Sequence, residues 1–380
     1  MNQSETILEL KNILIKRGGI QRLAVPALAI QKGEVLSLIG PNGAGKTTLL
    51  QTLAALIKPA EGSIYYYGQK VNEQVSVLDY RRKLAMVFQE SLLFSMSVFD
   101  NVALGLKMRG LRKAEIRARV MEQLQRFKIE HLSQRSSKAL SGGEAQRTSL
   151  ARAFATDPEV FLLDEPFSAL DPPTREALLE DLEAVLHKIR ITTVFATHDR
   201  WEALRLSDRI AVMNQGRILQ LDTPAQILNH PNDEFVGHFV GVETILSGKV
   251  IGGQDGCFTT QINEQKIEAI GTLQIGDTVS LFIRPDTVML SDRVLPEQTS
   301  ARNVFSGKIE KIIPMGFYEK VKLDCGFPLV AYITHESSRH LALQASKEVK
   351  IFIKATSIHV IKKCDHGYVT RVGAGPISPF

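Results

Sequence analysis

The chain has 380 residues, enough for two or three domains, and an ordinary globular composition with 44% hydrophobic and 23% charged residues. Its net charge of +5 comes from 46 basic and 41 acidic residues, a balance that does not argue for a nucleic-acid partner. No apolar run approaches the roughly 18 to 20 residues of a membrane span, and Met1 to Leu10 lacks a signal-peptide pattern. We therefore expect the protein to reach any membrane through partners that cross it.

The cysteines are few and isolated. Cys257, Cys325 and Cys364 form no CxxC pair, and their number is odd. This usage disfavours a disulfide framework or a zinc site and fits a reducing cytoplasm.

Residues 1–240 alternate between buried strands and amphipathic helices. Short continuous apolar runs are typical of strands that are covered on both faces, and stretches with apolar residues at helical spacing predict helices between them. This alternation predicts an α/β domain with a mostly parallel sheet, helices on both faces and a closing antiparallel part. The strands are expected at Glu34–Ile39, Val160–Leu163 and Ile191–Ala196, the helices at Thr47–Ile57 and Lys113–Phe127, and a hairpin at Ile210–Met213 and Arg217–Leu221.

After about residue 242 the pattern changes to short β-type runs separated by glycines. Leu246–Val250 resembles Phe305–Ile309, and Val279–Arg284 resembles Val349–Lys354, so the region contains an internal repeat whose second copy is longer. Each copy has the size of a small five-stranded barrel of the OB kind, and two unrelated β-hairpins are the alternative. The predicted domains are 1–241 and 242–380, and the predicted repeats are about 245–292 and 299–363.

A phosphate-binding loop lies between the first buried strand and the first helix. Its sequence, Gly-Pro-Asn-Gly-Ala-Gly-Lys-Thr-Thr, matches G-x-x-x-x-G-K-[ST]. Its glycines let backbone N–H groups point at phosphate oxygens, Lys46 can reach the β- and γ-phosphates, and the Thr47 hydroxyl can bind Mg²⁺. The predicted ATP-binding residues here are Gly40, Pro41, Asn42, Gly43, Ala44, Gly45, Lys46, Thr47 and Thr48.

Two later strands end in residues suited to hydrolysis. Val160–Leu163 is followed by Asp164 and Glu165, and the third strand is followed by His198. Because ligands bind at the carboxyl ends of parallel strands, we expect Asp164 to hold Mg²⁺, Glu165 to act as general base and His198 to contact the γ-phosphate.

A second anion site is expected at Leu140–Glu144. Ser141, Gly142 and Gly143 precede a helix-forming stretch, and a helix N-terminus binds anions. One phosphate chain does not need two such sites in one chain. A head-to-tail dimer, in which each chain completes the other's site, resolves this.

In order, these motifs resemble the Walker A, signature, Walker B and switch-histidine motifs of ABC ATPases, over about residues 5–240. Gln89 resembles the Q-loop residue of that family, and Ser168–Asp171 resembles its D-loop. The resemblance implies an ATP sandwich homodimer with Ser141 and Gly143 acting in trans. It also implies that Gln89 takes part in catalysis and in Mg²⁺ binding.

The resemblance further implies that Ser91–Leu106 touches a membrane-spanning permease at the cytoplasmic face of the inner membrane, with an extracytoplasmic solute-binding protein in the complex. A docking surface explains the apolar residues of this stretch better than core packing alone. These residues are Leu92, Leu93, Phe94, Met96 and Phe99.

Two positions depart from the family pattern. The last signature residue, usually Gln, is Glu144, which adds negative charge near a phosphate site, so we expect its side chain to face away or to be spaced from the nucleotide. No aromatic residue precedes Tyr65, although the family stacks one on adenine. Arg17 takes that position, and a guanidinium plane can stack on a base; a solvated loop charge is the alternative.

The C-terminal region resembles the transport-associated OB region of import ATPases, and its second copy resembles a small molybdate-binding barrel. Hydroxyl and cationic donors that converge would bind an oxyanion; a purely structural barrel is the alternative. The resemblance thus implies an importer for tungstate or molybdate. Sulfate, iron, sugar or polyamine are the other solutes, and a soluble ATPase acting on ribosomes or DNA is a more distant alternative. The candidate oxyanion residues are Ser300, Arg302, Lys354 and Thr356.

Overall fold

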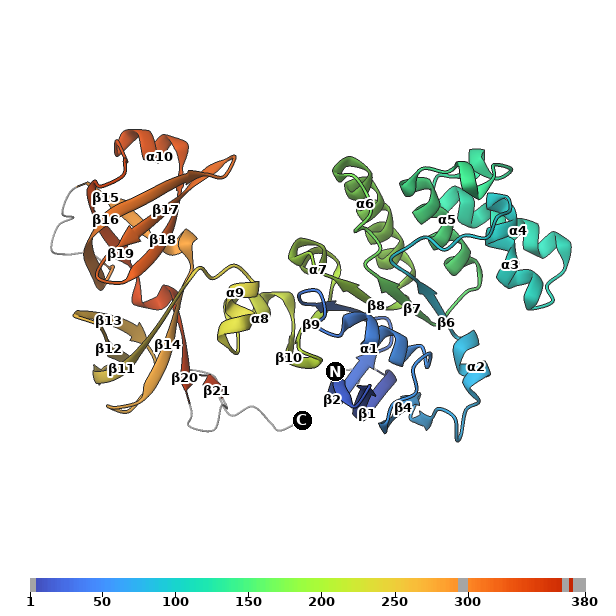
Figure 1. The fold of residues 1–380 in the computed structure, drawn as a ribbon, viewed down its shortest axis with the longest axis horizontal. Coiled ribbons are helices and arrows are strands. Elements are labelled where there is room, and N and C mark those ends of the chain that lie inside the picture. Colours follow the sequence, from blue (N-terminus) through green and yellow to red (C-terminus); the bar gives the residue numbers. More distant parts are fainter. Residues whose placement is uncertain (1–4, 293–299, 364–368, 372–380) are drawn as a thin grey trace. The chain divides into compact units, whose positions relative to one another are not determined.

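The computed structural model describes residues 5–292, 300–363 and 369–371. The chain divides into two compact units, Met1–Pro224 and Ala225–Phe380 (Figure 1). In the described part of the chain, no helix is both long and apolar enough to cross a membrane. The predicted domain limit at residue 241 stays a prediction, and residues 225–241 belong to the second unit. There, Glu234 accepts a hydrogen bond from Ser280 at 2.8 Å.

The first unit contains a six-stranded sheet. Its strands are β3 (Val35–Ile39), β6 (Leu84–Val87), β7 (Val160–Asp164), β8 (Thr192–Thr197), β9 (Arg209–Asn214) and β10 (Arg217–Asp222). They lie in the order β10-β9-β3-β8-β7-β6, and all neighbours are parallel except the β9–β10 hairpin. Alternate residues of β7 enter different apolar cores: Leu162 packs on one face of the sheet and Leu163 on the other. The predicted α/β class is confirmed.

An antiparallel sheet completes this unit, with strand order β2-β1-β4-β5. Its strands are β1 (Thr6–Arg17), β2 (Ile20–Gln31), β4 (Glu61–Tyr66) and β5 (Gln69–Lys70). The apolar core between this sheet and the parallel one also takes in the helix that follows the phosphate loop.

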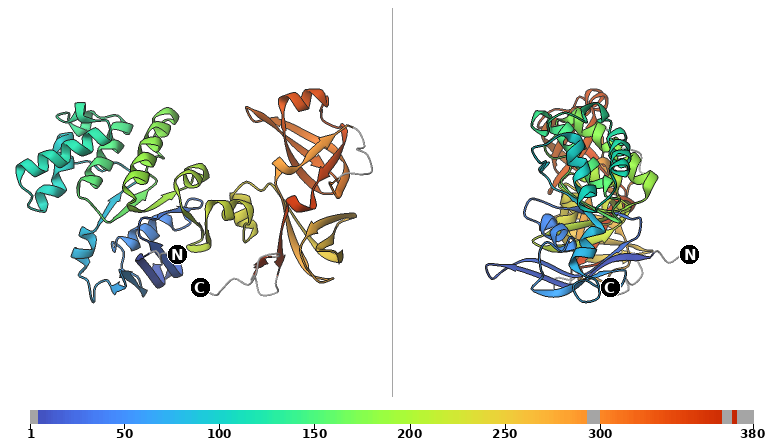
Figure 2. Two further views of the ribbon diagram at one scale, coloured as in Figure 1. Left: turned by 180° about the vertical axis from the view of Figure 1, so that it is seen from behind. Right: turned by 90° about the vertical axis from the view of Figure 1, so that its right-hand side faces the viewer.

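Helices cover the parallel sheet, and α3, α4 and α5 form a group beyond its β6 edge (Figures 1 and 2). The helices are α1 (Lys46–Leu53), α2 (Val77–Arg82), α3 (Val98–Met108), α4 (Lys113–Arg126), α5 (Gly142–Ala155), α6 (Pro172–Ile189) and α7 (Arg200–Leu206). The predicted helix at Thr47–Ile57 is shorter than expected, because Ala55 adopts a φ of 53° that a helix cannot continue.

The second unit is mostly β-structure. Its strands are β11 (Thr244–Gln254), β12 (Cys257–Ile262), β13 (Gln265–Ile270), β14 (Thr278–Ile283), β15 (Met289–Ser291), β16 (Asn303–Pro314), β17 (Tyr318–Asp324), β18 (Pro328–Thr334), β19 (Glu348–Ile353), β20 (Ile358–Lys363) and β21 (Val369–Arg371). They form two sheets, ordered β13-β12-β11-β14-β20-β21 and β15-β19-β16-β17-β18. The helices are α8 (Pro224–Asn229), α9 (Glu234–Phe239) and α10 (His335–His340). The all-β, OB-like class of this region is confirmed.

The two sequence copies have the same strand register but exchange a strand. Leu246 pairs with Leu281 in the first copy, as Phe305 pairs with Ile351 in the second. However, β20 of the second copy joins the first sheet, and β15 of the first copy joins the second. The simple expectation of one barrel per copy therefore fails at one strand in each. Cys325 is buried, Cys257 is half-buried, and both are free thiols; Cys364 and Thr299 lie outside the described residues.

Candidate nucleotide-binding site

The strand register brings the predicted residues to one edge of the parallel sheet. Ile39 pairs with Thr197 and Asp164 with Ala196, so β3, β7 and β8 end level with one another. The phosphate loop, Glu165 and His198 follow these strand ends directly. β6 ends in line with them, because Val87 pairs with Leu163, and Gln89 follows β6.

Close backbone packing shapes the phosphate loop. A Cβ at Gly40 would lie 2.2 Å from the carbonyl oxygen of Met213, so only glycine fits there. Gly45 is the N-cap of α1 with a φ of 102°. The buried Lys46 donates from Nζ to the carbonyl oxygens of Gly40 at 2.8 Å and Pro41 at 3.3 Å. These contacts hold the ammonium group over the loop.

Glu165 stands between a cation and an imidazole. Its Oε1 lies 3.5 Å from Lys46 Nζ, and its Oε2 lies 3.0 Å from His198 Nδ1. Its backbone has a φ of 45°, a conformation that non-glycine residues seldom adopt and that is found more often at functional sites. The carboxylate is thereby fixed from both sides and faces the phosphate loop.

Thr47 and Asp164 meet beside the loop. The Thr47 hydroxyl donates to Asp164 Oδ1 at 3.0 Å. Burial, with a smaller contribution from the neighbouring Glu165 carboxylate, raises the pKa of Asp164 above its ordinary value. A hydroxyl and a carboxylate oxygen are hard ligands of the kind that Mg²⁺ prefers, so this pair fits the predicted metal.

A cavity of about 1,050 Å³ opens beside the phosphate loop. Besides residues 42–48, its lining includes four other residues predicted from the sequence: Arg17, Gln89, Glu165 and His198. Arg22 also lines the cavity, although the sequence reasoning missed it. The Gly18-Gly19 turn predicts a hairpin that brings residues on its two sides together, but only the fold shows which of them face the loop.

Gln89 lies at the border of two cavities. Its Nε2 donates to Ser168 Oγ at 3.3 Å, which joins the predicted Q-loop and D-loop. It also lines a smaller cavity of about 510 Å³ together with Gly142 and Leu170. Gln89 therefore contacts both the nucleotide cavity and the region of the second anion site.

The second anion site forms a capped helix start away from the nucleotide cavity. The Ser141 hydroxyl accepts from the N–H of Glu144 at 3.3 Å, while Glu144 Oε2 accepts from the N–H of Ser141 at 2.7 Å. This capping box turns the Glu144 carboxylate back onto its own helix, in line with the expectation that it faces away. Ser141, Gly142 and Gly143 do not line the cavity beside the phosphate loop.

The segment after Gln89 exposes two large apolar side chains. Leu92 is 57% exposed and Phe94 is 52% exposed. Asn101, which is buried, donates to the carbonyl oxygen of Phe94 at 3.0 Å and accepts from its N–H at 2.9 Å. Arg152 donates to the carbonyl oxygen of Leu92 at 2.8 Å. Phe99, also expected on this surface, packs against the helical core instead.

The candidate oxyanion residues do not form an enclosed site. Ser300, Arg302, Lys354 and Thr356 are all exposed. Arg302 forms an ion pair with Glu268 at 3.2 Å. Thr356 lines a cavity of about 610 Å³, but the other three are not in its lining. An oxyanion site needs donors that exclude water, and the surroundings of these side chains do not supply that.

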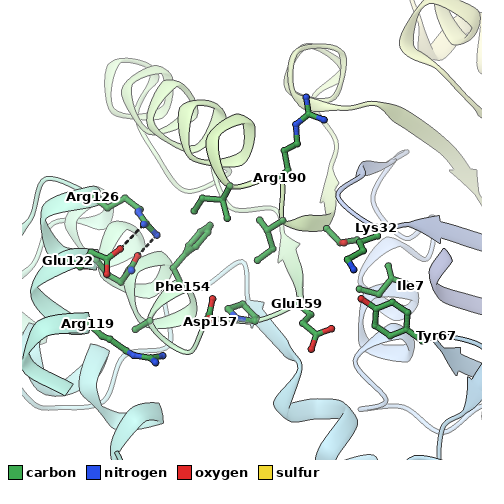
Figure 3. A pocket seen from close by; sticks show the side chains of 16 residues that line it. Ile7, Lys32, Tyr67, Arg119, Glu122, Arg126, Phe154, Asp157, Glu159 and Arg190 are labelled. Carbon is green, nitrogen blue, oxygen red and sulfur yellow. Dashed lines mark hydrogen bonds and ion pairs between the residues drawn. The ribbon is translucent and has the colours of Figure 1, made fainter. Parts of the chain in front are cut away.

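Figure 3 shows another cavity of the first unit, with a volume of about 760 Å³. It lies at the opposite ends of the strands, where Asp157 and Pro158 precede β7 and Ile191 precedes β8. Arg126 on its wall is paired with Glu122 at 2.9 Å. None of the residues predicted for ATP, Mg²⁺ or oxyanion binding lines it.

Comparison with known proteins identifies two regions. Residues 23–168 match the ABC transporter family, and residues 299–360 match the TOBE domain. The chain is similar in structure to cbiO1 of Clostridium perfringens, described as part of the ABC transporter complex cbiONQ. That similarity has a TM-score of 0.55 and 30% identity, and it covers 63% of this chain and 96% of that one.

Relatives that cover most of the chain are named for different solutes. The spermidine/putrescine import ATP-binding protein PotA of Fusobacterium nucleatum is 38% identical, over 80% of this chain and 81% of that protein. The molybdate/tungstate import ATP-binding protein WtpC of Pyrococcus abyssi is 36% identical, over 87% and 93%. The sulfate/thiosulfate import ATP-binding protein CysA of Thermosynechococcus vestitus is 35% identical, over 91% and 96%.

Proposed function

The chain belongs to the ABC transporter family as an import subunit that hydrolyses ATP to drive transport, and we propose that it does so at the cavity beside Lys46 to import a small oxyanion. The observation that carries the choice of site is the arrangement of Lys46, Glu165 and His198 at the level ends of parallel strands. A base, a cation and an imidazole meet there beside a phosphate loop.

In this mechanism Glu165 is the general base. It accepts a proton as water attacks the γ-phosphorus, and ADP leaves with the electrons of the broken P–O bond. His198 orients the Glu165 carboxylate through its contact at 3.0 Å and contacts the γ-phosphate. Lys46 neutralises phosphate charge from its position over the loop.

Thr47, Asp164 and Gln89 are the proposed Mg²⁺ ligands. Mg²⁺, when bound, neutralises negative charge on the β- and γ-phosphate oxygens. The chain's own contribution is to hold the oxygen ligands in place, through the hydrogen bond between Thr47 and Asp164. The other ATP-binding residues are Gly40 to Thr48 and Arg17.

The active form is a homodimer in which Ser141, Gly142 and Gly143 of one chain complete the nucleotide site of the other. Two observations support this arrangement. These residues lie outside the cavity of their own phosphate loop, and they form the N-terminus of the 14-residue helix α5, where N–H groups and the helix dipole favour an anion.

Leu92 and Phe94 are the proposed contacts with a permease in the inner membrane, at its cytoplasmic face, and an extracytoplasmic solute-binding protein completes the complex. Exposed apolar side chains on a backbone held by Asn101 and Arg152 give a rigid surface for an apolar partner. The protein is thus peripheral to the membrane.

Tungstate or molybdate is the proposed solute, supported by the relative named for molybdate/tungstate import and by the match to the TOBE domain. Polyamine and sulfate are equally open, because the PotA and CysA relatives are similarly close. Feedback by the oxyanion on ATP hydrolysis stays a prediction for the second unit, with a purely structural barrel as its alternative, but Ser300, Arg302, Lys354 and Thr356 form no enclosed site for it within one chain.

Uptake measurements test this proposal. Cells that lack the chain are given molybdate, tungstate, sulfate and spermidine separately, and accumulation of each is compared with cells carrying wild type or Glu165→Gln. We expect only the wild type to restore molybdenum and tungsten accumulation. Restoration of spermidine or sulfate uptake alone would assign a different solute. ATPase activity of the assembled transporter with and without millimolar molybdate tests the feedback step, and equal rates contradict it.

A further inference from the structure

Two arginines of the β1–β2 hairpin form part of the wall of the proposed nucleotide cavity. Arg17 of β1 and Arg22 of β2 line it, together with Ile15 and Ile57. Among the described lining residues there is no Phe, Tyr or Trp. A base bound beside these residues therefore meets aliphatic side chains and guanidinium groups rather than a Phe, Tyr or Trp ring.

A β-bulge sets the position of Arg22. Ile15 pairs with Leu23 and Lys16 with Gln21, so Arg22 is the extra residue on its strand. Bulges are common beside active sites, where they redirect a side chain. A backbone hydrogen bond next to the bulge fixes it in place: the N–H of Ala24 donates to the carbonyl oxygen of Gly216 at 2.7 Å.

Gly216 allows this close approach. A Cβ on Gly216 would lie 2.3 Å from the carbonyl oxygen of Arg22. Gly216 in turn donates its N–H to the carbonyl oxygen of Ala44 in the phosphate loop at 2.9 Å. The backbone at Arg22 is therefore tied, through one glycine, to the loop that holds the phosphates.

The two guanidinium groups have no partner for their charge among the described residues. Within the described part of the chain, neither Arg17 nor Arg22 forms an ion pair or a side-chain hydrogen bond. Lys16, which also lines the cavity, differs from them, because its Nζ lies 3.7 Å from Glu61 Oε1. Five N–H donors on each arginine thus face a cavity whose ligand must supply acceptors.

We propose that Arg22, together with Arg17, binds the purine base, and that GTP is a second substrate that binds at least as well as ATP. This inference rests on the proposed nucleotide site. Guanine presents two acceptors, O6 and N7, on one edge, which match the two parallel N–H groups of a guanidinium. Adenine presents N7 beside an amino donor, and arginine has only donors. Hydrolysis is otherwise unchanged, with water attacking the γ-phosphorus and GDP leaving.

The test compares four proteins with three nucleotides. Wild type, Arg22→Ala, Arg22→Lys and Arg17→Ala are assayed for hydrolysis of ATP, GTP and 7-deaza-GTP, and calorimetry gives the dissociation constants in the Glu165→Gln background. We expect wild-type kcat/KM for GTP to equal or exceed that for ATP. Arg22→Ala should lower the GTP value about tenfold and the ATP value less, because a bidentate contact to guanine is lost. Arg22→Lys should keep the charge but lose the preference.

Arg82→Ala is the matched control, since Arg82 is an exposed arginine of α2 outside this cavity. Arg17→Ala should weaken both nucleotides about tenfold if Arg17 stacks on the base. A wild-type preference for ATP over GTP of tenfold or more would overturn the inference, as would an equal loss for both nucleotides in Arg22→Ala. If the wild type hydrolyses neither nucleotide, the proposed function fails, and the dissociation constants still decide the base preference.

Discussion

The phosphate-loop cavity and the β-region after residue 242 both contain polar residues that the sequence marks as functional, but their surroundings differ. In the first, Glu165 lies 3.5 Å from Lys46 and 3.0 Å from His198. In the second, Arg302 is exposed and paired with Glu268, and Lys354 is exposed as well. The side chains of the first region converge on a cavity where a ligand can bind. Those of the second region either form ion pairs between strands or face solvent.

The reason lies in how each fold carries its residues. Parallel strands of matched register deliver whatever follows them to one edge, so a short motif suffices. In the repeat region the two copies exchange β15 and β20. Side chains at equivalent positions of the two copies form hydrogen bonds between the two sheets. Asn303 accepts from the N–H of Glu268 at 2.7 Å, and its counterpart Thr244 accepts from the N–H of Val330 at 3.2 Å.

The largest expected effect tests the catalytic side of this contrast. Glu165→Gln should lower ATP turnover by about 10²- to 10⁴-fold, because the general base is lost while shape is kept. ATP binding should persist. Turnover is measured by phosphate release and binding by calorimetry, with Glu73→Gln, an exposed acidic residue paired with Lys70, as control. Turnover that persists in Glu165→Gln would show that another group is the base.

The next prediction tests whether Asn303 is a structural residue. Asn303→Ala removes a buried amide that bonds both the N–H and the carbonyl oxygen of Glu268. We expect the second unit to lose about 1–3 kcal/mol of stability, with no change in the KM for ATP. Denaturant unfolding and steady-state kinetics measure the two effects.

Arg302→Ala is the matched comparison for that experiment. Arg302 is the preceding residue, and its exposed ion pair contributes only about 0–1 kcal/mol. A loss of stability in Arg302→Ala as large as in Asn303→Ala would contradict the distinction between the two positions. If molybdate changes ATPase activity in the wild type but not in Arg302→Ala, the β-region is a binding site after all.

A smaller effect is expected at the capped helix start. Glu144→Gln keeps the capping box but removes a charge near the proposed trans phosphate site. The hydrogen bond from the Ser141 N–H lowers the pKa of Glu144, so this carboxylate is charged at neutral pH. We expect the KM for ATP to fall by about two- to threefold at low salt and the difference to shrink at high salt. Glu115→Gln on α4 is the control, and an unchanged KM would mean that the carboxylate is spaced from the nucleotide.

The smallest effect concerns His335 in the second unit. Its ring nitrogens lie 2.7 Å from the carbonyl oxygen of Gly316 and 3.1 Å from Glu319, so both contacts are made only when both nitrogens carry protons. These contacts raise the pKa of His335 above its ordinary value, and the nearby Arg339 opposes them. Stability from this group is therefore full below about pH 6.5 and is lost as pH rises through the raised pKa.

NMR titration of His335 and unfolding between pH 6 and pH 9 measure this effect. His335→Gln should remove a small pH dependence from the second unit while leaving ATP hydrolysis unchanged. A titration midpoint at or below the ordinary histidine value would contradict the prediction.

The sequence by itself determined the fold class and the order of the motifs. Continuous apolar runs before Gly40, Asp164 and His198 specify parallel strands, and such strands can place the following residues only at one edge. The repeat was visible as well, because equivalent residues keep the same spacing within each copy.

Only the tertiary structure decided three other points. The exchange of β15 and β20 is one of them. Each strand could pair within its own copy or with the other copy, and the local sequence pattern does not distinguish the two pairings. The position of Arg22 depends on a bulge that Gly216 permits from 194 residues away in the chain. Arg302 forms an ion pair with Glu268, a residue far from it in the chain, and only the fold brings the two together. Local periodicity fixes which residues are buried, whereas pairing between distant strands fixes which polar groups remain to meet a ligand.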